Sequence, residues 1–308
     1  RIGRPWQDAS WISLHGRDPA PLAQRLQQRP TALAVLTDPS RGGAEEVRTI
    51  LRASGLEASY AVWLCEQLGH ANERVKRLTS QDELPSDLHP LHLVVLLAER
   101  DISPGDPAEL TLFGIDDGIF LQHHDRPGLM TKKELRVQLL AELDLPEQGV
   151  LWDLGAGVGS VGLEALRLRP KLQLLAVEKR GGGTALIKAN AARLAVQPTA
   201  VLETEALDLL NGTDLPPSLS HPNRVLLGGG GRQRAELLQA VLQRLQPNGV
   251  VVIPLATVEA LAELRPLLEA SSCTVKVNQH QAWRGLPLAD GTRMAPMNPV
   301  IILKGTAP

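Results

Sequence analysis

Three glycines at alternate positions follow an acid in the sequence VLWDLGAGVGSVGLEA, which covers residues 150–165. The acid is Asp153, and the glycines are Gly155, Gly157 and Gly159. Glycine tolerates a positive φ and has no side chain, so such a loop lets backbone N–H groups approach a ligand closely. The stretch also contains the pattern G-x-G-x-x-G, which alone is weak evidence for dinucleotide binding. The spacing therefore predicts a ligand loop and leaves the class of ligand open.

Two carboxylates narrow the class of ligand. Asp153 stands two residues before the first glycine, where it would repel a pyrophosphate and favour a ligand that carries an ammonium and a sulfonium. Glu178 ends the apolar run LQLLAVE, where a carboxylate accepts hydrogen bonds from both hydroxyls of a ribose. S-adenosylmethionine combines these groups and is the predicted cofactor, whereas NAD is disfavoured. The structural alternative is a tight strand-to-helix turn beside a solvated acid.

The elements that would position these residues alternate regularly after residue 130. The expected strands cover residues 149–154, 172–178, 199–203, 224–227, 249–255, 273–283 and 298–303. The expected helices cover residues 131–143, the glycine loop to about 169, 184–195, 232–245 and 257–270. This alternation predicts a doubly wound, Rossmann-like parallel sheet, closed by an antiparallel pair because no helix separates the last two strands. Ligands of such sheets bind beyond the carboxyl ends of the strands, where the glycine loop lies.

Local signals predict one helix start and one domain boundary. Thr131, with Glu134 three residues on, has the spacing of a capping box. The first hundred residues contain apolar runs that predict a strand–helix–strand unit of an α/β domain. The stretch RDISPGDPAEL, with two prolines and a glycine, predicts a boundary. We therefore expect a domain at 1–100, a linker at 101–111 and a second domain at 112–308.

Composition excludes several classes of partner. The net charge of −2 and an aromatic content of 3% argue against nucleic-acid binding. The apolar runs are too short to span a bilayer, so we expect no membrane partner and a cytoplasmic protein. Cys65 and Cys273 predict buried free thiols. His123, His124 and Asp125 are interpreted as loop residues, not as a metal site, because no further ligands are spaced nearby.

Taken together and in order, five segments of the second domain resemble the decarboxylating precorrin methyltransferases of cobalamin biosynthesis. The segments are MTKKELR (130–136), LWDLGAGVGSVGLEA (151–165), AVEKR (176–180), LLGGGG (226–231) and NPVIIL (298–303). The first hundred residues are similar to the later half of a tetrapyrrole methylase of the same pathway. The front half of that methylase, with its own glycine-rich loop, is not in the sequence, so we expect an incomplete methylase site.

The resemblance implies a cofactor site and a substrate site. The residues implied to hold S-adenosylmethionine are Thr131, Asp153, Gly155, Ala156, Gly157, Val158, Gly159, Glu178, Glu205 and Ala206. The residues suggested for the polycarboxylate substrate are Lys132, Arg136, Gly228, Gly229, Gly230 and Arg293. Around the adenine, Thr204 replaces a glycine that the family usually has.

The resemblance further implies methylation of a precorrin macrocycle at the meso carbon C15, with decarboxylation of the C12 acetate. Methylation at C5 would be the role of the first domain. Substrates with and without cobalt fit the resemblance, which also implies a tetramer. Two alternatives stay open: a methyltransferase of the same fold that acts on RNA or protein, and an inactive cofactor-binding scaffold.

Overall fold

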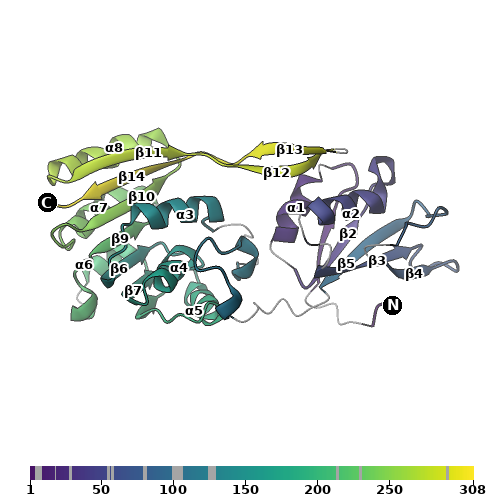
Figure 1. Ribbon diagram of the computed structural model, residues 1–308, viewed down its shortest axis with the longest axis horizontal. Helices are drawn as coiled ribbons and strands as arrows, with labels where there is room; N and C mark the ends of the chain where they lie inside the picture. Colours follow the sequence, from purple (N-terminus) through teal and green to yellow (C-terminus); the bar gives the residue numbers. More distant parts are fainter. Residues whose placement is uncertain are drawn as a thin grey trace. The chain divides into compact units, whose positions relative to one another are not determined.

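The computed structural model describes residues 1–308 except 4–8, 18, 28–29, 54–55, 57–58, 79–81, 99–106, 124–129, 213–214, 229–230 and 289–290. The chain forms two units (Figure 1), of which the first contains residues 1–105 and 283–295. The second unit contains residues 106–282 and 296–308. The assignment of the first unit to a tetrapyrrole methylase stays a prediction.

The first unit contains a five-stranded sheet in the order β1-β2-β5-β3-β4. Its elements are β1 (Ser10–Ser13), α1 (Ala20–Gln27), β2 (Ala32–Leu36), η1 (Pro39–Arg41), α2 (Gly43–Ala53), β3 (Tyr60–Glu66), β4 (Arg74–Leu78) and β5 (His92–Ala98). The predicted strand–helix–strand unit corresponds to β2, α2 and β3. β5 lies between β2 and β3 and pairs antiparallel with both, so this sheet is mostly antiparallel. Buried side chains of α1 and α2 pack on the strands to form its core.

A seven-stranded sheet in the order β11-β14-β10-β9-β6-β7-β8 forms the second unit. Its strands are β6 (Gln148–Leu154), β7 (Lys171–Val177), β8 (Ala200–Leu202), β9 (Arg224–Leu227), β10 (Val250–Leu255), β11 (Thr274–His280) and β14 (Val300–Thr306). β6 to β10 are parallel to one another. β14 runs antiparallel to both β10 and β11. The predicted doubly wound sheet with an antiparallel end is therefore confirmed.

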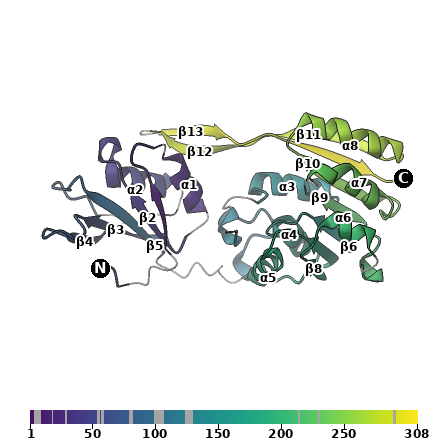
Figure 2. The same cartoon turned by 180° about the vertical axis from the view of Figure 1, so that it is seen from behind.

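Helices cover both faces of this sheet, as Figure 1 and the view from behind in Figure 2 show. The first face carries α3 (Lys133–Glu142), α4 (Ser160–Leu168) and α5 (Gly183–Arg193). The opposite face carries α6 (Ala206–Asn211), α7 (Arg234–Leu242) and α8 (Val258–Ala270). Side chains of a strand alternate between faces, so Leu151 packs toward α3 and α4 while Trp152 packs toward the other layer. Asp153 consequently lies on the α4 side of β6.

Short 3-10 helices occupy several connections of the second unit. They are η3 (Pro107–Glu109), η4 (Asp117–Ile119), η5 (Pro217–Leu219) and η6 (Gly231–Gln233). The predicted strand 273–283 is in part wrong. β11 ends at His280, and a separate two-stranded sheet follows, made of β12 (Trp283–Leu288) and β13 (Gly291–Pro296). This hairpin belongs to the first unit.

The sequence predicted buried free thiols and no segment long enough to span a membrane. Cys65 and Cys273 are free and buried, as predicted. Among the helices of the described residues, none is long and apolar enough to cross a membrane.

Candidate functional site

The glycine loop connects β6 to α4 at the carboxyl edge of the sheet. Gly155, Gly157 and Gly159 all have a positive φ, of 81°, 59° and 79°. A Cβ on Gly155 would lie 2.5 Å from the carbonyl oxygen of Gly228, at the end of the neighbouring β9, so the two backbones touch here. A Cβ on Gly157 would have no atom within 4 Å. The loop is therefore packed at its start and open at Gly157, where a ligand has room to approach.

Glu178 follows the last residue of β7 and faces this open glycine. Its Oε2 accepts a hydrogen bond from the Gly157 N–H at 2.7 Å, and its Oε1 accepts one from the Arg180 N–H at 2.9 Å. A Cβ on Gly183 would lie 2.6 Å from Cγ of Glu178, so the start of α5 packs directly on this side chain. The carboxylate is half-buried and fixed in position beside the loop.

Asp153 lies near the end of β6, in a buried environment beside the glycine loop. Its side chain is 2% exposed and lies under the first turn of α4, where Oδ2 accepts a hydrogen bond from the Gly162 N–H at 3.1 Å. The pKa of Asp153 is raised to about 7, mainly by burial; the Gly162 hydrogen bond lowers it, and the nearby charge of Glu178 adds a smaller increase. Asp153 therefore supports the helix that follows the loop, and its place among the residues that bind the cofactor stays a prediction.

The residues expected around the adenine lie at the carboxyl end of β8. Glu205 immediately precedes α6 and forms an ion pair with Lys179 at 3.0 Å. Ala206 is buried in the first turn of that helix. The Glu178 N–H donates to the Leu202 carbonyl at 3.0 Å, which ties the ends of β7 and β8 together. The structure thus places Glu205 and Ala206 on the same edge of the sheet as the glycine loop.

Two residues of the loop differ in what they offer a ligand. Ala156 is half-buried, and its N–H donates to the Val177 carbonyl at 2.9 Å. The Val158 side chain is 1% exposed and packs in the core. Val158 therefore offers its backbone, and not its side chain, to a ligand at this edge, and its role in holding the cofactor stays a prediction.

Arg136 is not available to a substrate, because its side chain is fully buried in α3. Its guanidinium donates to Glu164 at 2.5 Å, to Asp117 at 3.2 Å, to the Thr131 carbonyl at 2.7 Å and to the Ile115 carbonyl. The Phe120 ring packs 4.8 Å from the guanidinium carbon. The prediction that Arg136 binds substrate is wrong, since the side chain is fully buried and all three nitrogens of its guanidinium donate to partners within the protein.

The start of α3 also differs from the expectation. Lys132 is the N-cap and makes no side-chain capping bond, and the helix begins at Lys133 instead of Thr131. The Lys133 N–H is capped by Asp117 Oδ1 at 2.9 Å, from a segment far away in the sequence. The predicted capping box is therefore wrong. Thr131 and Lys132 are both half-buried beside this cap.

Sequence reasoning missed two buried polar residues that hold this part of the site. Glu164 accepts the N–H groups of Gly114 and Ile115 at 2.7 and 3.1 Å. Asn190 bonds both backbone groups of Leu121 and donates to the Val158 carbonyl at 2.9 Å. The segment 114–121 is thereby joined to α4, α5 and the glycine loop. The available signal was an acid and an amide in helices whose neighbouring residues are apolar.

The remaining predicted substrate residues are placed only in part. Gly228 donates its N–H to the Leu154 carbonyl at 2.7 Å and lies against the glycine loop. Gly229 and Gly230 lie outside the described residues. Arg293 is exposed on β13, which belongs to the first unit.

His123 is half-buried, and His124 and Asp125 lie outside the described residues. In the described part of the chain, no group of three or more His, Cys, Asp or Glu residues could hold a metal ion.

Comparisons with known proteins match this architecture. Residues 122–306 match the family model of the precorrin methyltransferase domain. A precorrin-6Y C(5,15)-methyltransferase (decarboxylating) of Sinorhizobium is 31% identical over 264 residues, which are 86% of this chain and 60% of the relative. A probable cobalt-precorrin-6B C(15)-methyltransferase (decarboxylating) of Pyrobaculum aerophilum is 34% identical over 63% of this chain and 96% of its own length. The crystal structure of a precorrin-6Y C5,15-methyltransferase from Geobacter metallireducens has a TM-score of 0.56 and 29% identity, and it covers 64% of this chain and 99% of that one. This chain thus spans about 60% of the length of the Sinorhizobium relative.

Proposed function

This chain belongs to the precorrin methyltransferase family, and we propose that it methylates the meso carbon C15 of a precorrin and decarboxylates its C12 acetate arm. The names of the relatives from Sinorhizobium and Pyrobaculum both include methylation at C15 and decarboxylation. The observation that carries the proposal is the open glycine loop at the carboxyl edge of the sheet, with the Glu178 carboxylate held against Gly157.

The residues at this edge fit S-adenosylmethionine, the methyl donor of this family. Each oxygen of Glu178 accepts one backbone N–H, and a carboxylate offers about four acceptor positions. Two acceptor positions therefore stay available for the two hydroxyls of a ribose. The bare backbone at Gly157 gives room for the methionine end, and Glu205 with Ala206 would flank the adenine.

The charges at this edge suit a cation better than a phosphate. Glu178 and the buried Asp153 both lie beside the loop, and the charge of the first raises the pKa of the second. A bound cation would favour the ionised form of Asp153, whereas a pyrophosphate would meet two carboxyl groups. This arrangement supports a sulfonium cofactor over a dinucleotide.

When bound, the cofactor supplies an electrophilic methyl group on sulfur. The nucleophile is a carbon of an electron-rich tetrapyrrole, so no strong side-chain base is required. The protein mainly has to hold the two reactants in line, which is catalysis by proximity and orientation. Gly155 and Gly228 serve this purpose, because their direct backbone contact fixes the glycine loop against the end of β9.

The decarboxylation needs no reactant other than one proton from solvent. The bond between the arm's methylene carbon and its carboxylate carbon breaks, carbon dioxide leaves, and the electron pair passes into the conjugated ring. A solvent proton completes the new methyl group. Desolvation of the carboxylate next to the ring would favour this step.

For the first unit we propose a part in methylation at C5. The Sinorhizobium match covers 86% of this chain, so it extends into the first unit, and the name of that relative includes both carbons. Family likeness also leads us to propose a tetramer of the second unit. Light scattering on the purified chain tests this, and a monomer at micromolar concentration would contradict it.

The direct test incubates the purified chain with S-adenosylmethionine and the reduced precorrin, with and without cobalt, and measures the product mass. We expect one added methyl and one lost carbon dioxide from the second unit. Two added methyls would assign C5 activity to this chain as well. No change of mass, together with tight cofactor binding, would favour an inactive scaffold. Methylation of RNA or protein under the same conditions would favour a different substrate class.

A further inference from the structure

A small pocket lies on the carboxyl edge of the second unit's sheet, between α3 and the ends of β11 and β14. β10 and β11 both pair antiparallel with β14, so β11 ends at the same edge as the parallel strands. His280 is the last residue of β11 and pairs with Val300, the first residue of β14. The pocket therefore shares its edge with the glycine loop, where ligands of doubly wound sheets bind.

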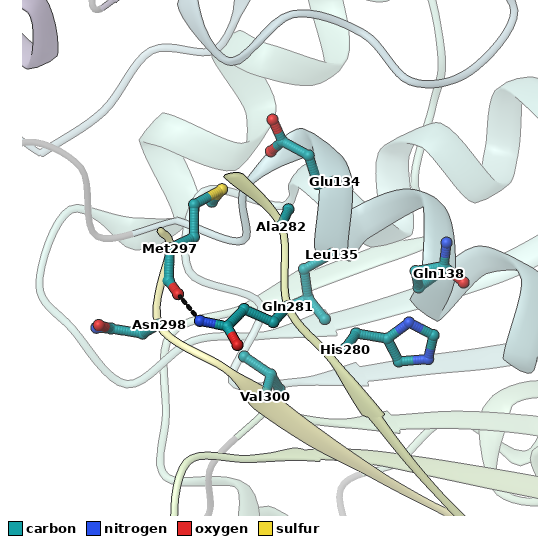
Figure 3. Close-up of a pocket in the computed structure, with 9 residues that line it drawn as sticks. All are labelled: Glu134, Leu135, Gln138, His280, Gln281, Ala282, Met297, Asn298 and Val300. Atoms are coloured by element: carbon teal, nitrogen blue, oxygen red, sulfur yellow. Dashed lines mark hydrogen bonds between the residues drawn. The ribbon is translucent and has the colours of Figure 1, made fainter. Parts of the chain in front are cut away.

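His280, which lines this pocket, has a ring nitrogen that is not used within the described protein. Gln281 donates its side-chain N–H to the Met297 carbonyl at 3.3 Å, as Figure 3 shows. His280 Nε2 is buried and has no hydrogen-bond partner among the described residues. Figure 3 shows its ring on the same side of the pocket as the Gln138 amide of α3. A buried polar atom without a partner is costly, so a turn of the ring that brings Nε2 to a ligand atom in the pocket would be favoured.

The size and lining of the pocket suit a short side arm. Its volume is about 120 Å³, which equals about four water molecules at ~30 Å³ each and is far too small for a macrocycle. Leu135, Ala282 and Val300 form an apolar wall that would contact methylene groups. Glu134 also lines the pocket, and in Figure 3 its carboxylate points away from His280. A carboxymethyl or carboxyethyl group therefore matches both the apolar wall and the polar end.

We propose that this pocket binds one carboxylate arm of the tetrapyrrole substrate, with His280 Nε2 and the Gln138 amide as hydrogen-bond donors. The inference rests on the proposed function, since it assigns a subsite for that substrate. His280 donates in the tautomer with its proton on Nε2, or as the imidazolium. The pocket would fix the orientation of the macrocycle and would leave the cofactor site unchanged.

Kinetics of two substitutions at one position test this subsite. His280→Leu removes the donor, and we expect KM for the precorrin to rise about ten-fold, since hydrogen bonds to charged groups are among the stronger ones. His280→Gln places an amide N–H near the position of Nε2, so its KM should return toward the parent value. Neither change should alter the dissociation constant of S-adenosylmethionine. A KM of His280→Leu within two-fold of the parent would overturn the proposal.

A matched control separates this effect from a general loss of stability. His221 is exposed and precedes β9, at the opposite edge of the sheet, so His221→Leu should keep the parent KM. Melting temperatures are measured for all variants. An equal loss of affinity in His280→Leu and His280→Gln, with both melting temperatures lowered, would assign His280 a structural role and reject the subsite.

A binding probe separates this proposal from the proposed function. Uroporphyrin, a tetrapyrrole with free carboxylate arms, is titrated by fluorescence against the parent chain and His280→Leu, and the fully esterified porphyrin serves as the control. We expect the substitution to weaken binding of the acid about ten-fold and to leave binding of the ester unchanged. If the parent does not methylate precorrin but shows this difference, the proposed function fails and the carboxylate subsite stands. If the parent methylates precorrin and His280→Leu behaves like it in both assays, the subsite alone fails.

Discussion

Two neighbouring regions of the second unit use their polar groups in opposite ways. Around Arg136, each polar side chain is matched by protein partners: Glu164 alone accepts from Arg136 and from two backbone N–H groups. At the carboxyl edge, Glu178 has acceptor positions to spare, and His280 Nε2 has no partner in the described part of the chain. We call the surroundings of Arg136, where polar groups are hydrogen-bonded within the protein, the saturated region; it forms the structural frame of the unit. We call the carboxyl edge of the sheet at Glu178 and His280, where a ligand would complete the hydrogen bonds, the unsaturated edge.

The comparison explains why the charge of a residue was a poor guide to its role. Arg136 and Lys132 are neighbours in one motif and were both expected to bind a polycarboxylate. A cation with a complete set of partners offers nothing to a substrate, and an unpaired buried charge would be too costly to keep. Binding residues are better found among polar atoms that the fold leaves incomplete.

The largest expected effect is a loss of stability from a substitution in the saturated region. Glu164→Ala removes one of the two carboxylates that pair with the Arg136 guanidinium, the other being Asp117, and leaves two backbone N–H groups without an acceptor. Removing one partner of a buried ion pair typically costs about 3–5 kcal/mol, and we expect a loss of this size in the free energy of unfolding. Urea denaturation measures it.

Glu164→Gln is the matched variant, because the amide keeps one acceptor oxygen and the size of the side chain. We expect it to lose less stability than Glu164→Ala. The dissociation constant of S-adenosylmethionine, measured on the folded variant, should stay within about two-fold of the parent. A loss under 1 kcal/mol for Glu164→Ala would mean that the region is not the frame of this unit.

The second largest effect is a loss of cofactor affinity from a substitution at the unsaturated edge. Glu178→Ala removes the proposed acceptor of both ribose hydroxyls, and two hydrogen bonds to a charged group together account for about a hundred-fold in affinity. We expect the dissociation constant of S-adenosylmethionine to rise by about that factor in calorimetry. Glu236→Gln, on the exposed side of α7, is the control and should bind like the parent. Unchanged affinity in Glu178→Ala would remove this residue from the cofactor site.

A third pair of changes sharpens the contrast within the glycine loop itself. Gly155→Ala would place a Cβ 2.5 Å from the Gly228 carbonyl oxygen, whereas Gly157→Ala meets nothing within 4 Å. Both substitutions place a side chain on a left-handed backbone, which costs about 1–2 kcal/mol, and only Gly155→Ala adds a clash. We therefore expect Gly155→Ala to lose about 2 kcal/mol or more of stability and Gly157→Ala about 1 kcal/mol.

The two glycine variants should also differ in their affinity for S-adenosylmethionine. Gly157→Ala puts a methyl group into the open space where the ligand approaches, so its loss of affinity should exceed what its small loss of stability suggests. Thermal unfolding measures the stability of the two variants, and calorimetry measures their affinity for S-adenosylmethionine. Equal stability losses would contradict the backbone contact between the loop and β9.

The order of strands and helices in the second unit could be predicted because its signals are local. Apolar runs of strand length alternate with helical spacing, and the boundaries of β6, β7 and β9 lie within one residue of the expected ones. The antiparallel end followed from two strands without a helix between them. β12 was merged with β11 because residues 281 and 282 carry no strong turn signal, and β4 was missed because RVKRL is too polar to predict a strand.

The site was less predictable because its geometry depends on contacts far apart in the sequence. The cap of α3 comes from Asp117 and not from Thr131, and no local pattern shows that Asp117 reaches Lys133. Alternation along β6 does indicate that Asp153 shares a face with Leu151, which is buried. That signal was available and places Asp153 under α4.

The smallest expected effect concerns Asp153, which belongs fully to neither region. Its pKa is raised from 3.8 to about 7 in the folded chain, mainly by burial, so the folded state holds a proton that the unfolded state releases near pH 4. The stabilisation from this group is therefore complete below about pH 4, declines as the pH rises, and is lost above pH 7. Linkage with these two pKa values gives a decline of about 1.4 kcal/mol between pH 6 and pH 8.

Asp153→Asn isolates this contribution, because the amide oxygen can still accept the Gly162 N–H and carries no titrating proton. We expect the difference in free energy of unfolding between Asp153→Asn and the parent to shift in favour of the variant by about 1.4 kcal/mol from pH 6 to pH 8. Denaturation curves at both pH values measure the shift. A constant difference would mean that Asp153 is already ionised at pH 6, which would require a cation or a water path at this carboxylate and would move it from the frame to the ligand edge.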